Sequence, residues 1–152
     1  GRHPVVRAPR LVVVFGPSGA GKSTHCAASF PPHTVIGPDR YRVKGGRWSH
    51  DGTTNAVGRC RAEAHRRLAM RVGPVVVDTA ATLHRHLAEW AQVAADHGVP
   101  VEWVGITTRQ WETLRRNRHR TPDRKLQWMW ESMAATLDEW TLPGDLTVIT
   151  DR

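Results

Sequence analysis

The sequence lacks any apolar run long enough to cross a membrane and any segment typical of a secretory signal. A membrane-spanning helix needs roughly 18 apolar residues, a length that no run in this chain approaches. The first ten residues, GRHPVVRAPR, have no apolar centre, so they do not resemble a signal peptide. Cysteine is also rare: Cys26 and Cys60 are the only two in the sequence. They form no Cys-x-x-Cys or mixed Cys/His spacing. We therefore expect a cytoplasmic protein that spans no membrane and has two reduced, structural thiols.

Internal repeats, low-complexity tracts and linker-like segments are absent as well. The nine histidines are scattered and form no His-Glu-x-x-His pattern, so we predict no histidine metal site. With 152 residues, the chain has the size of one compact domain and is too short for two full ones. We predict a single domain over residues 1–152.

Positive charge is in excess, with 22 Lys plus Arg against 14 Asp plus Glu and a formal net charge of +8. This balance favours an anionic partner, which can be nucleic acid, a nucleotide or an acidic membrane surface. Most of the excess is arginine, whose planar guanidinium suits bidentate contacts to phosphate. The charge does not choose among these partners, and a basic surface without a specific partner remains an alternative.

Short apolar runs alternate with helical patterns along the chain. Continuous apolar runs, which are typical of strands buried on both faces, occupy residues 11–15, 75–77, 101–106 and 146–150, with a weaker fifth at residues 34–37. Apolar residues recur at helical spacing in the stretches 57–68, 83–94 and 126–137. Strand alternating with helix predicts an α/β fold with a parallel sheet of about five strands and helices on both faces.

Tryptophan positions and one loop-like stretch complete the expected fold. Trp90, Trp130 and Trp140 fall on the apolar stripes, so we expect them to pack in or beside the core. Trp128 points away from its stripe, so an exposed or ligand-facing role is an alternative to packing for this residue. Residues 43–58 are the most loop-like segment, and a loop of that length in a small domain is either functional or mobile.

Residues 16–23, GPSGAGKS, match the pattern G-x-x-x-x-G-K-[ST] between a predicted strand and a helical stretch. In this arrangement, glycines let backbone N–H groups converge on a phosphate at the positive end of the helix. Lys22 is expected to neutralise the β- and γ-phosphates, and Ser23 to hold Mg²⁺. We predict a site for ATP or another nucleoside triphosphate made of Gly16, Ser18, Gly19, Ala20, Gly21, Lys22, Ser23 and Thr24. A nucleotide site without transfer chemistry remains an alternative.

Two acidic residues follow predicted strands. Asp39, with Arg42 three residues later, comes after the weak strand, and Asp78 ends the strand that begins at residue 75. Carboxyl ends of neighbouring parallel strands meet over the phosphate site, where Asp39 can accept a proton from a hydroxyl and Arg42 can bind an acceptor phosphate. A surface pair is the alternative for these two. We predict that Asp78 is a Mg²⁺ ligand, with orientation of Asp39 or of the acceptor, or a helix N-cap, as its alternatives.

An arginine-rich segment, RRNRHRTPDRK, covers residues 115–125 between helical stretches. Arg116 and Arg120 have the spacing of one helix face, and Arg124 follows a predicted turn. Arginines at this position can close over the triphosphate as a lid and stabilise charge on the transferred phosphoryl group. A solvated basic face is the alternative interpretation.

Taken in order, the P-loop, strand-D-x-x-R, strand-D-T and R-N-x-x-R-x-x-x-R resemble the polynucleotide 5′-kinase family, the kinase module of nucleic-acid end-healing enzymes, over about residues 11–140. The resemblance implies a P-loop kinase fold in which Lys22 and Ser23 bind ATP and Mg²⁺, Asp39 is the general base and Arg42 binds the acceptor phosphate. It also implies a lid formed by Arg116, Arg120 and Arg124.

This sequence departs from the family in two ways. The family usually has an asparagine shortly after the third-strand aspartate, whereas DTAAT has alanines there, which leaves the role of Asp78 open. Family members are often fused to phosphatase or ligase modules, and we expect any such activity to come from a separate chain.

We therefore predict an ATP- and Mg²⁺-dependent kinase that phosphorylates 5′-hydroxyl ends of RNA or DNA, with Lys22, Asp39, Arg42 and Arg120 as catalytic residues. Some arginines around the 57–68 helix are expected to contact the acceptor backbone, from the set Arg59, Arg61, Arg66, Arg67 and Arg71. Two alternatives remain. One is a small-molecule kinase with a closed acceptor pocket of mixed polarity, acting on a metabolite or antibiotic hydroxyl, and the other is a nucleotide-dependent nucleic-acid-binding module without transfer activity.

Overall fold

A five-stranded parallel sheet forms the centre of the computed structural model, which describes residues 8–44, 47–48, 53–109, 116–117 and 121–151. The strand order is β2-β5-β1-β6-β7, and every neighbouring pair is parallel. The strands are β1 (Leu11–Phe15), β2 (Val35–Ile36), β5 (Val75–Thr79), β6 (Val101–Thr108) and β7 (Asp145–Asp151). This arrangement confirms the predicted α/β fold.

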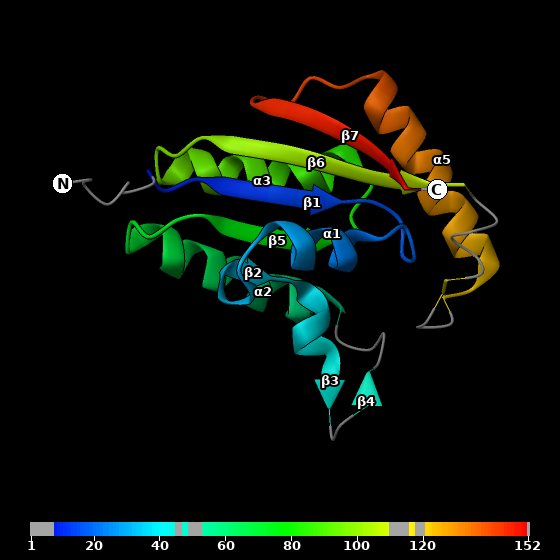
Figure 1. Cartoon of the computed structure of the whole chain (residues 1–152), viewed down its shortest axis with the longest axis horizontal. Coiled ribbons are helices and arrows are strands. Elements are labelled where there is room, and N and C mark those ends of the chain that lie inside the picture. Colours follow the sequence, from blue (N-terminus) through cyan, green and yellow to red (C-terminus); the bar gives the residue numbers. More distant parts are fainter. Residues whose placement is uncertain (1–7, 45–46, 49–52, 110–115, 118–120, 152) are drawn as a thin grey trace.

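Among the described residues, four α-helices cover the two faces of this sheet (Figure 1), and they are α1 (Lys22–Ser29), α2 (Thr53–Ala69), α3 (His84–Asp96) and α5 (Asp123–Asp138). Alternate residues of β1 face opposite sides, as a strand requires. Leu11 and Val13 pack with α2, α3 and α5, whereas Val12 and Val14 pack with α1. Figure 1 accordingly shows α1 in front of the strands and α3 behind them.

An aromatic cluster fixes the end of α5 against the centre of the sheet. Trp140 stacks on Phe15 of β1 with ring centroids 5.6 Å apart, and Trp103 of β6 meets both rings edge-on. The indole of Trp103 also donates a hydrogen bond to the Pro143 carbonyl, 2.7 Å away. Trp90 is buried and Trp130 and Trp140 are half-buried, which confirms the packing expected for these three. Trp128 is 48% exposed, in line with the alternative of an exposed or ligand-facing role.

The cysteines lie in the core on opposite faces of the sheet. Cys26 belongs to α1 and Cys60 to α2, and both are free and buried. Burial is the main cause that raises the pKa of each thiol, from 9.0 to about 12. These are inert thiols of the kind predicted, because the reactive thiolate form is disfavoured.

Strand β7 departs from the prediction of burial on both faces. It pairs only with β6 and forms an edge of the sheet, and its Val148 is 46% exposed. Its apolar run resembles that of a central strand, but strand order places no second neighbour beside it. No helix among the described residues is both long and apolar enough to cross a membrane.

The segment between β2 and α2 is more regular than the long loop predicted for residues 43–58. After the short helix η1 (Pro32–Thr34) and β2, a second short helix, η2 (Pro38–Arg42), leads to an antiparallel pair, β3 (Val43–Lys44) and β4 (Arg47–Trp48). This pair projects from the lower side of the molecule in Figure 1, away from the sheet. α2 already begins at Thr53, so the last six residues of the predicted loop are helical.

Candidate active site

The P-loop connects β1 to α1 and depends on backbone shapes that only glycine adopts readily. Gly16 follows β1 with φ +149°, and a Cβ there would collide with the Ile106 carbonyl of the neighbouring strand β6. Gly21 is the N-cap of α1, with φ 106°. These two positions explain why the motif needs glycine at both ends, and they place the positive end of α1 at the loop.

Lys22 is buried inside this loop. Its side chain is 8% exposed, and its Nζ donates a hydrogen bond to the Pro17 carbonyl, 3.0 Å away. Burial lowers the pKa of the Lys22 ammonium, and the charges of Asp78 and then Asp39 act in the opposite direction. Two carboxylates from different strand ends are therefore within electrostatic reach of the P-loop lysine, as strand polarity predicted.

Ser23 and Asp78 form the other contact at this edge of the sheet. Ser23 Oγ donates a hydrogen bond to Asp78 Oδ2 at 2.9 Å. The alternative of Asp78 as a helix N-cap is wrong, because α3 begins after Leu83 with no side-chain cap. A hydroxyl and a carboxylate are the hard oxygen ligands that Mg²⁺ prefers, so these two side chains fit the ion. The described residues contain no cluster of three or more His, Cys, Asp or Glu for a metal.

Asp39 lies on η2, directly after β2. Gly37 lets this segment approach β5, since a Cβ at Gly37 would lie 2.7 Å from the Asp78 carbonyl oxygen. The close approach brings η2 beside the strand end that carries Asp78. Asp39 itself is exposed. Arg42 ends η2, and its side chain lies outside the part that the structure describes.

Two arginines hold η2 in place. Within η2, Arg40 Nη2 donates to the Val35 carbonyl of β2, 3.2 Å away. Tyr41 packs against the core, and the Arg59 guanidinium of α2 lies 4.9 Å from the centroid of its ring. No motif in the sequence indicates a role for Tyr41. Its position between Asp39 and Arg42 is the one sequence signal that points to it.

Of the predicted lid arginines, Arg116 lies half-buried in a turn and Arg124 is exposed in the first turn of α5. Arg120 lies outside the described residues, so the helix face predicted for Arg116 and Arg120 is not tested. Asn117 has a role that the sequence analysis missed. Its side chain donates to the Thr121 carbonyl at 2.6 Å and accepts from the Thr121 N–H at 3.0 Å, which braces the chain just before α5.

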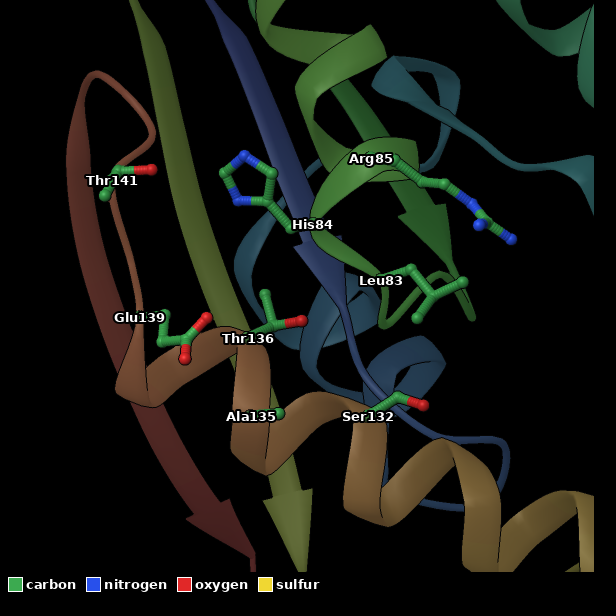
Figure 2. A pocket seen from close by; sticks show the side chains of 8 residues that line it. All are labelled: Leu83, His84, Arg85, Ser132, Ala135, Thr136, Glu139 and Thr141. Atoms are coloured by element: carbon green, nitrogen blue, oxygen red, sulfur yellow. The ribbon is translucent and has the colours of Figure 1, made fainter.

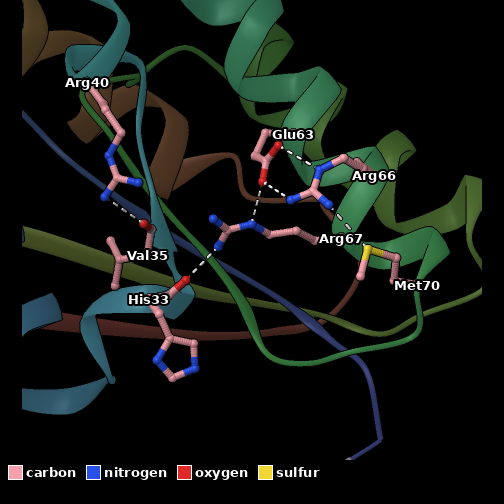
Figure 3. A network of polar contacts seen from close by, with 7 residues as sticks. All are labelled: His33, Val35, Arg40, Glu63, Arg66, Arg67 and Met70. Atoms are coloured by element: carbon pink, nitrogen blue, oxygen red, sulfur yellow. Dashed lines mark hydrogen bonds and ion pairs between the residues drawn. The ribbon is translucent and has the colours of Figure 1, made fainter.

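Three charged side chains of α2 form a network that ties the helix to the start of β2. Arg66 Nη2 and Arg67 Nε lie 2.6 and 2.8 Å from the same oxygen, Glu63 Oε1. Arg67 also donates to the His33 carbonyl at 2.7 Å. Figure 3 shows both guanidinium groups turned toward Glu63, with Arg67 reaching onward to His33. Hydrogen bonds from Arg66 and then Arg67 lower the pKa of Glu63 to about 2.

Two more arginines connect α2 to α3. Arg61 Nη2 lies 2.7 Å from Glu89 Oε2, and Arg71 Nη1 donates to the His97 carbonyl at 2.8 Å. Four of the five arginines predicted as acceptor contacts thus have partners within the fold. The arginines proposed as acceptor contacts thus mostly make structural contacts with carboxylates or carbonyls. Among the described residues of this set, Arg59 instead contacts an aromatic ring.

A pocket of about 700 Å³ lies between the start of α3 and the second half of α5. Figure 2 shows its lining, which comes from α3 on one side and from α5 and the chain just after it on the other. The lining is of mixed polarity, with Leu83, His84 and Arg85 from the α3 side and Ser132 and Glu139 from the α5 side. None of the predicted site residues lines it.

A family model described as "AAA domain" matches residues 11–139. The match begins at β1 and ends just after α5, so it includes the P-loop, Asp39, Asp78 and the arginine-rich segment. No curated protein matches the sequence.

Solved structures of low sequence identity share the fold. A chain of the Pnkp1/Rnl/Hen1 RNA repair complex matches with 16% identity and a TM-score of 0.72, over 90% of this chain and 47% of that one. A chain of the AvrRxo1-ORF1:-ORF2 complex with ATP matches with 14% identity and a TM-score of 0.70, over 95% and 55%. A sugar kinase from Janibacter sp. HTCC2649 matches with 19% identity and a TM-score of 0.56, over 93% and 85%. This chain thus spans about half the length of the first two, and has the P-loop kinase fold.

Proposed function

This chain belongs to the AAA-domain family, and we propose that it is an ATP-dependent phosphotransferase that acts on 5′-hydroxyl ends of RNA or DNA. One observation carries the proposal: Asp39 and Asp78, at the ends of two different strands, both act on the charge of the buried P-loop residue Lys22. The proposed proton acceptor and the proposed Mg²⁺ ligand therefore both lie within electrostatic reach of the proposed phosphate-binding cation, which supports a site for phosphoryl transfer.

The P-loop binds the donor. The backbone of residues 16–21 and the N-terminus of α1 contact the β-phosphate, with Ser18, Gly19, Ala20 and Thr24 as further contacts. Lys22 Nζ leaves the Pro17 carbonyl, which it contacts at 3.0 Å, and binds the phosphate oxygens. Ser23 and Asp78 would hold Mg²⁺, which would supply neutralisation of the phosphate charge.

Asp39 serves the acceptor. Its exposed carboxylate takes the proton of the attacking hydroxyl while the hydroxyl oxygen forms a bond to the γ-phosphorus. The bond between the γ-phosphorus and the β–γ bridging oxygen breaks, and ADP leaves. Arg42 binds the phosphate that adjoins the acceptor hydroxyl. Arg116, Arg120 and Arg124 stabilise the charge on the moving phosphoryl group, and most of the acceleration comes from positioning and electrostatics.

A small-molecule kinase is the second candidate, and one observation favours it. The pocket between α3 and α5 has the mixed polarity that suits a small hydroxyl compound. The absence of predicted site residues from its lining weighs against this candidate.

The test is transfer from γ-labelled ATP to a 5′-hydroxyl oligonucleotide, run beside a panel of sugars, nucleosides and other small hydroxyl compounds. We expect label on the oligonucleotide, and a rate about 10²- to 10⁴-fold lower for Asp39→Ala with unchanged ATP affinity. Asp138→Ala, which removes an exposed carboxylate at the end of α5, is the matched control.

The other outcomes distinguish the alternatives. Label on small compounds alone would favour the second candidate. Binding of ATP and oligonucleotide without labelled product would indicate a binding module. Normal turnover in Asp39→Ala would contradict the assignment of Asp39 as the base.

A further inference from the structure

Arg59 differs from the other arginines of α2 in what it contacts. The other three, and Arg71 just after the helix, contact carboxylates or backbone carbonyls. Among the described residues, the contact of the Arg59 guanidinium is the ring of Tyr41, at 4.9 Å from the centroid, and Arg59 is exposed. The ring holds the exposed guanidinium in position through a cation–π contact. A guanidinium has five N–H donors, a number and geometry that suit phosphate.

This position is beside the proposed acceptor site. Tyr41 belongs to η2, two residues after Asp39 and one before Arg42. Its ring also packs against the core, so the platform beneath Arg59 is fixed by the fold. Arg59 and η2 therefore form one unit, in which a positive charge stands next to the element that carries the proposed base.

The residue after Arg59 lies within electrostatic reach of Asp78 at the end of β5. This residue, Cys60, is buried, and burial raises the pKa of its thiol to about 12. The charges of Arg40, Arg67 and Arg61 oppose this rise, and the charge of Asp78 adds to it. This part of α2 is therefore within electrostatic reach of the same carboxylate that contacts the P-loop serine.

We propose that Arg59, held over Tyr41, binds a backbone phosphate of the acceptor strand and so selects a polyanionic acceptor over a neutral one. The proposal rests on the proposed function. A guanidinium that binds phosphate through charge-assisted hydrogen bonds contributes affinity rather than chemistry. Arg59 is accordingly a binding residue, and Tyr41 is the residue that positions it.

The experiment compares Arg59→Gln with Arg66→Gln in transfer to a single-stranded 5′-hydroxyl oligonucleotide. Both changes remove one exposed arginine charge from α2, but Arg66 is paired with Glu63. We expect Arg59→Gln to raise KM for the oligonucleotide about tenfold with kcat and KM for ATP within about twofold. The slope of log KM against log salt should fall by about 0.7, the share of one phosphate contact on a single strand. Arg66→Gln should leave KM within about twofold.

Oligonucleotides with uncharged backbone linkages identify which phosphate Arg59 contacts. Oligonucleotides with one methylphosphonate, placed in turn at each of the first four linkages, remove one phosphate charge at a time. If Arg59 binds one of these phosphates, that substitution raises KM for the wild type but has no further effect in Arg59→Gln. Additive effects at all four linkages, or equal KM for the two arginine variants, would overturn the proposal.

Two controls separate a structural effect from a binding effect. Tyr41→Phe keeps the aromatic face and should retain wild-type KM, whereas Tyr41→Leu should raise KM as Arg59→Gln does. An equal loss of kcat and of thermal stability in Arg59→Gln would show that Arg59 only holds η2 in place, which also overturns the proposal. If the wild type labels no oligonucleotide, the proposed function fails and this inference fails with it; if it labels oligonucleotide and Arg59→Gln is unchanged, only this inference fails.

Discussion

The P-loop and the η2–α2 segment lie at the same edge of the sheet, but they are held in different ways. The P-loop depends on backbone shape and burial, as Gly16 at φ +149° and the buried Lys22 show. The η2–α2 segment depends on side-chain contacts between separate elements, such as Arg59 on the Tyr41 ring and Arg67 on the His33 carbonyl. The P-loop, the proposed donor side, therefore depends on the backbone conformation of a few neighbouring residues. The η2–α2 segment, the proposed acceptor side, depends on contacts between residues far apart in the sequence.

The largest expected effect comes from breaking the donor side at Lys22. Lys22→Ala removes the buried cation that binds the transferred phosphoryl group, so transfer to every acceptor should fall at least about 10²- to 10³-fold. The measurement is the initial rate with saturating ATP and either an oligonucleotide or a small hydroxyl compound. Lys125→Ala, at an exposed position of α5, should keep the wild-type rate. A loss limited to one class of acceptor would contradict the assignment of Lys22 to the donor.

Two glycine substitutions, one in the P-loop and one in α2, test the difference between the two segments through the free energy of unfolding. Gly16→Ala places a Cβ against the Ile106 carbonyl at a positive φ and should lower the free energy of unfolding by about 3 kcal/mol. Gly58 lies within α2, where a Cβ would meet nothing within 4 Å, so Gly58→Ala should raise it by about 0.5–1 kcal/mol. Urea unfolding of the two variants tests both values. Equal effects of the two substitutions would contradict the contrast.

The same difference explains which features could be predicted from the sequence. Four apolar runs and the P-loop motif are local patterns, so the strands and the phosphate site followed directly from them. The convergence of Asp39 and Asp78 on Lys22 followed from strand polarity alone. The edge position of β7 could not be predicted, because exposure of Val148 depends on strand order rather than on the strand's own residues.

Contacts on the acceptor side escaped prediction for the same reason. The arginines of α2 appeared as candidate acceptor contacts because their partners, among them Glu89 on α3 and the His33 carbonyl before β2, are distant in the sequence. The helix N-cap remained an alternative for Asp78 because Leu83, the N-cap of α3, gives no N-cap signal in the sequence. Contacts between residues distant in the sequence, more than local secondary-structure propensity, determine the structure of the η2–α2 segment.

Asp78 lies between the two regions, and Asp78→Asn tests which one it serves. Replacing a carboxylate ligand with an amide should lower the transfer rate about 10- to 100-fold at a fixed Mg²⁺ concentration, and excess Mg²⁺ should restore part of the loss. The measurement is a Mg²⁺ titration of the initial rate. Asp96→Asn, where the carboxylate accepts a hydrogen bond from Gln92 on α3, is the control. A rate loss that Mg²⁺ leaves unchanged would instead assign Asp78 to the orientation of Asp39 or the acceptor.

The smallest expected effect concerns the network that supports the acceptor side. Hydrogen bonds from Arg66 and Arg67 lower the pKa of Glu63 from 4.5 to about 2, so the folded state favours its ionised form. Because the folded-state pKa is depressed, this stabilisation is fully present above about pH 4.5 and is lost as the pH falls toward 2. Glu63→Gln should therefore cost about 1 kcal/mol at pH 7, and the difference from wild type should shrink through this window.

Urea unfolding at pH 7, 4 and 3 measures this difference. Glu131→Gln is the control, since Glu131 accepts a hydrogen bond from the neutral Gln127 at 3.2 Å and should show a cost of only a few tenths of a kcal/mol. If the cost of Glu63→Gln stayed constant from pH 7 to 3, the contribution of Glu63 would come from packing rather than charge. The support of η2 and α2 by this network would then come from packing, and the contrast between the two sides would rest on Arg59 and Tyr41 alone.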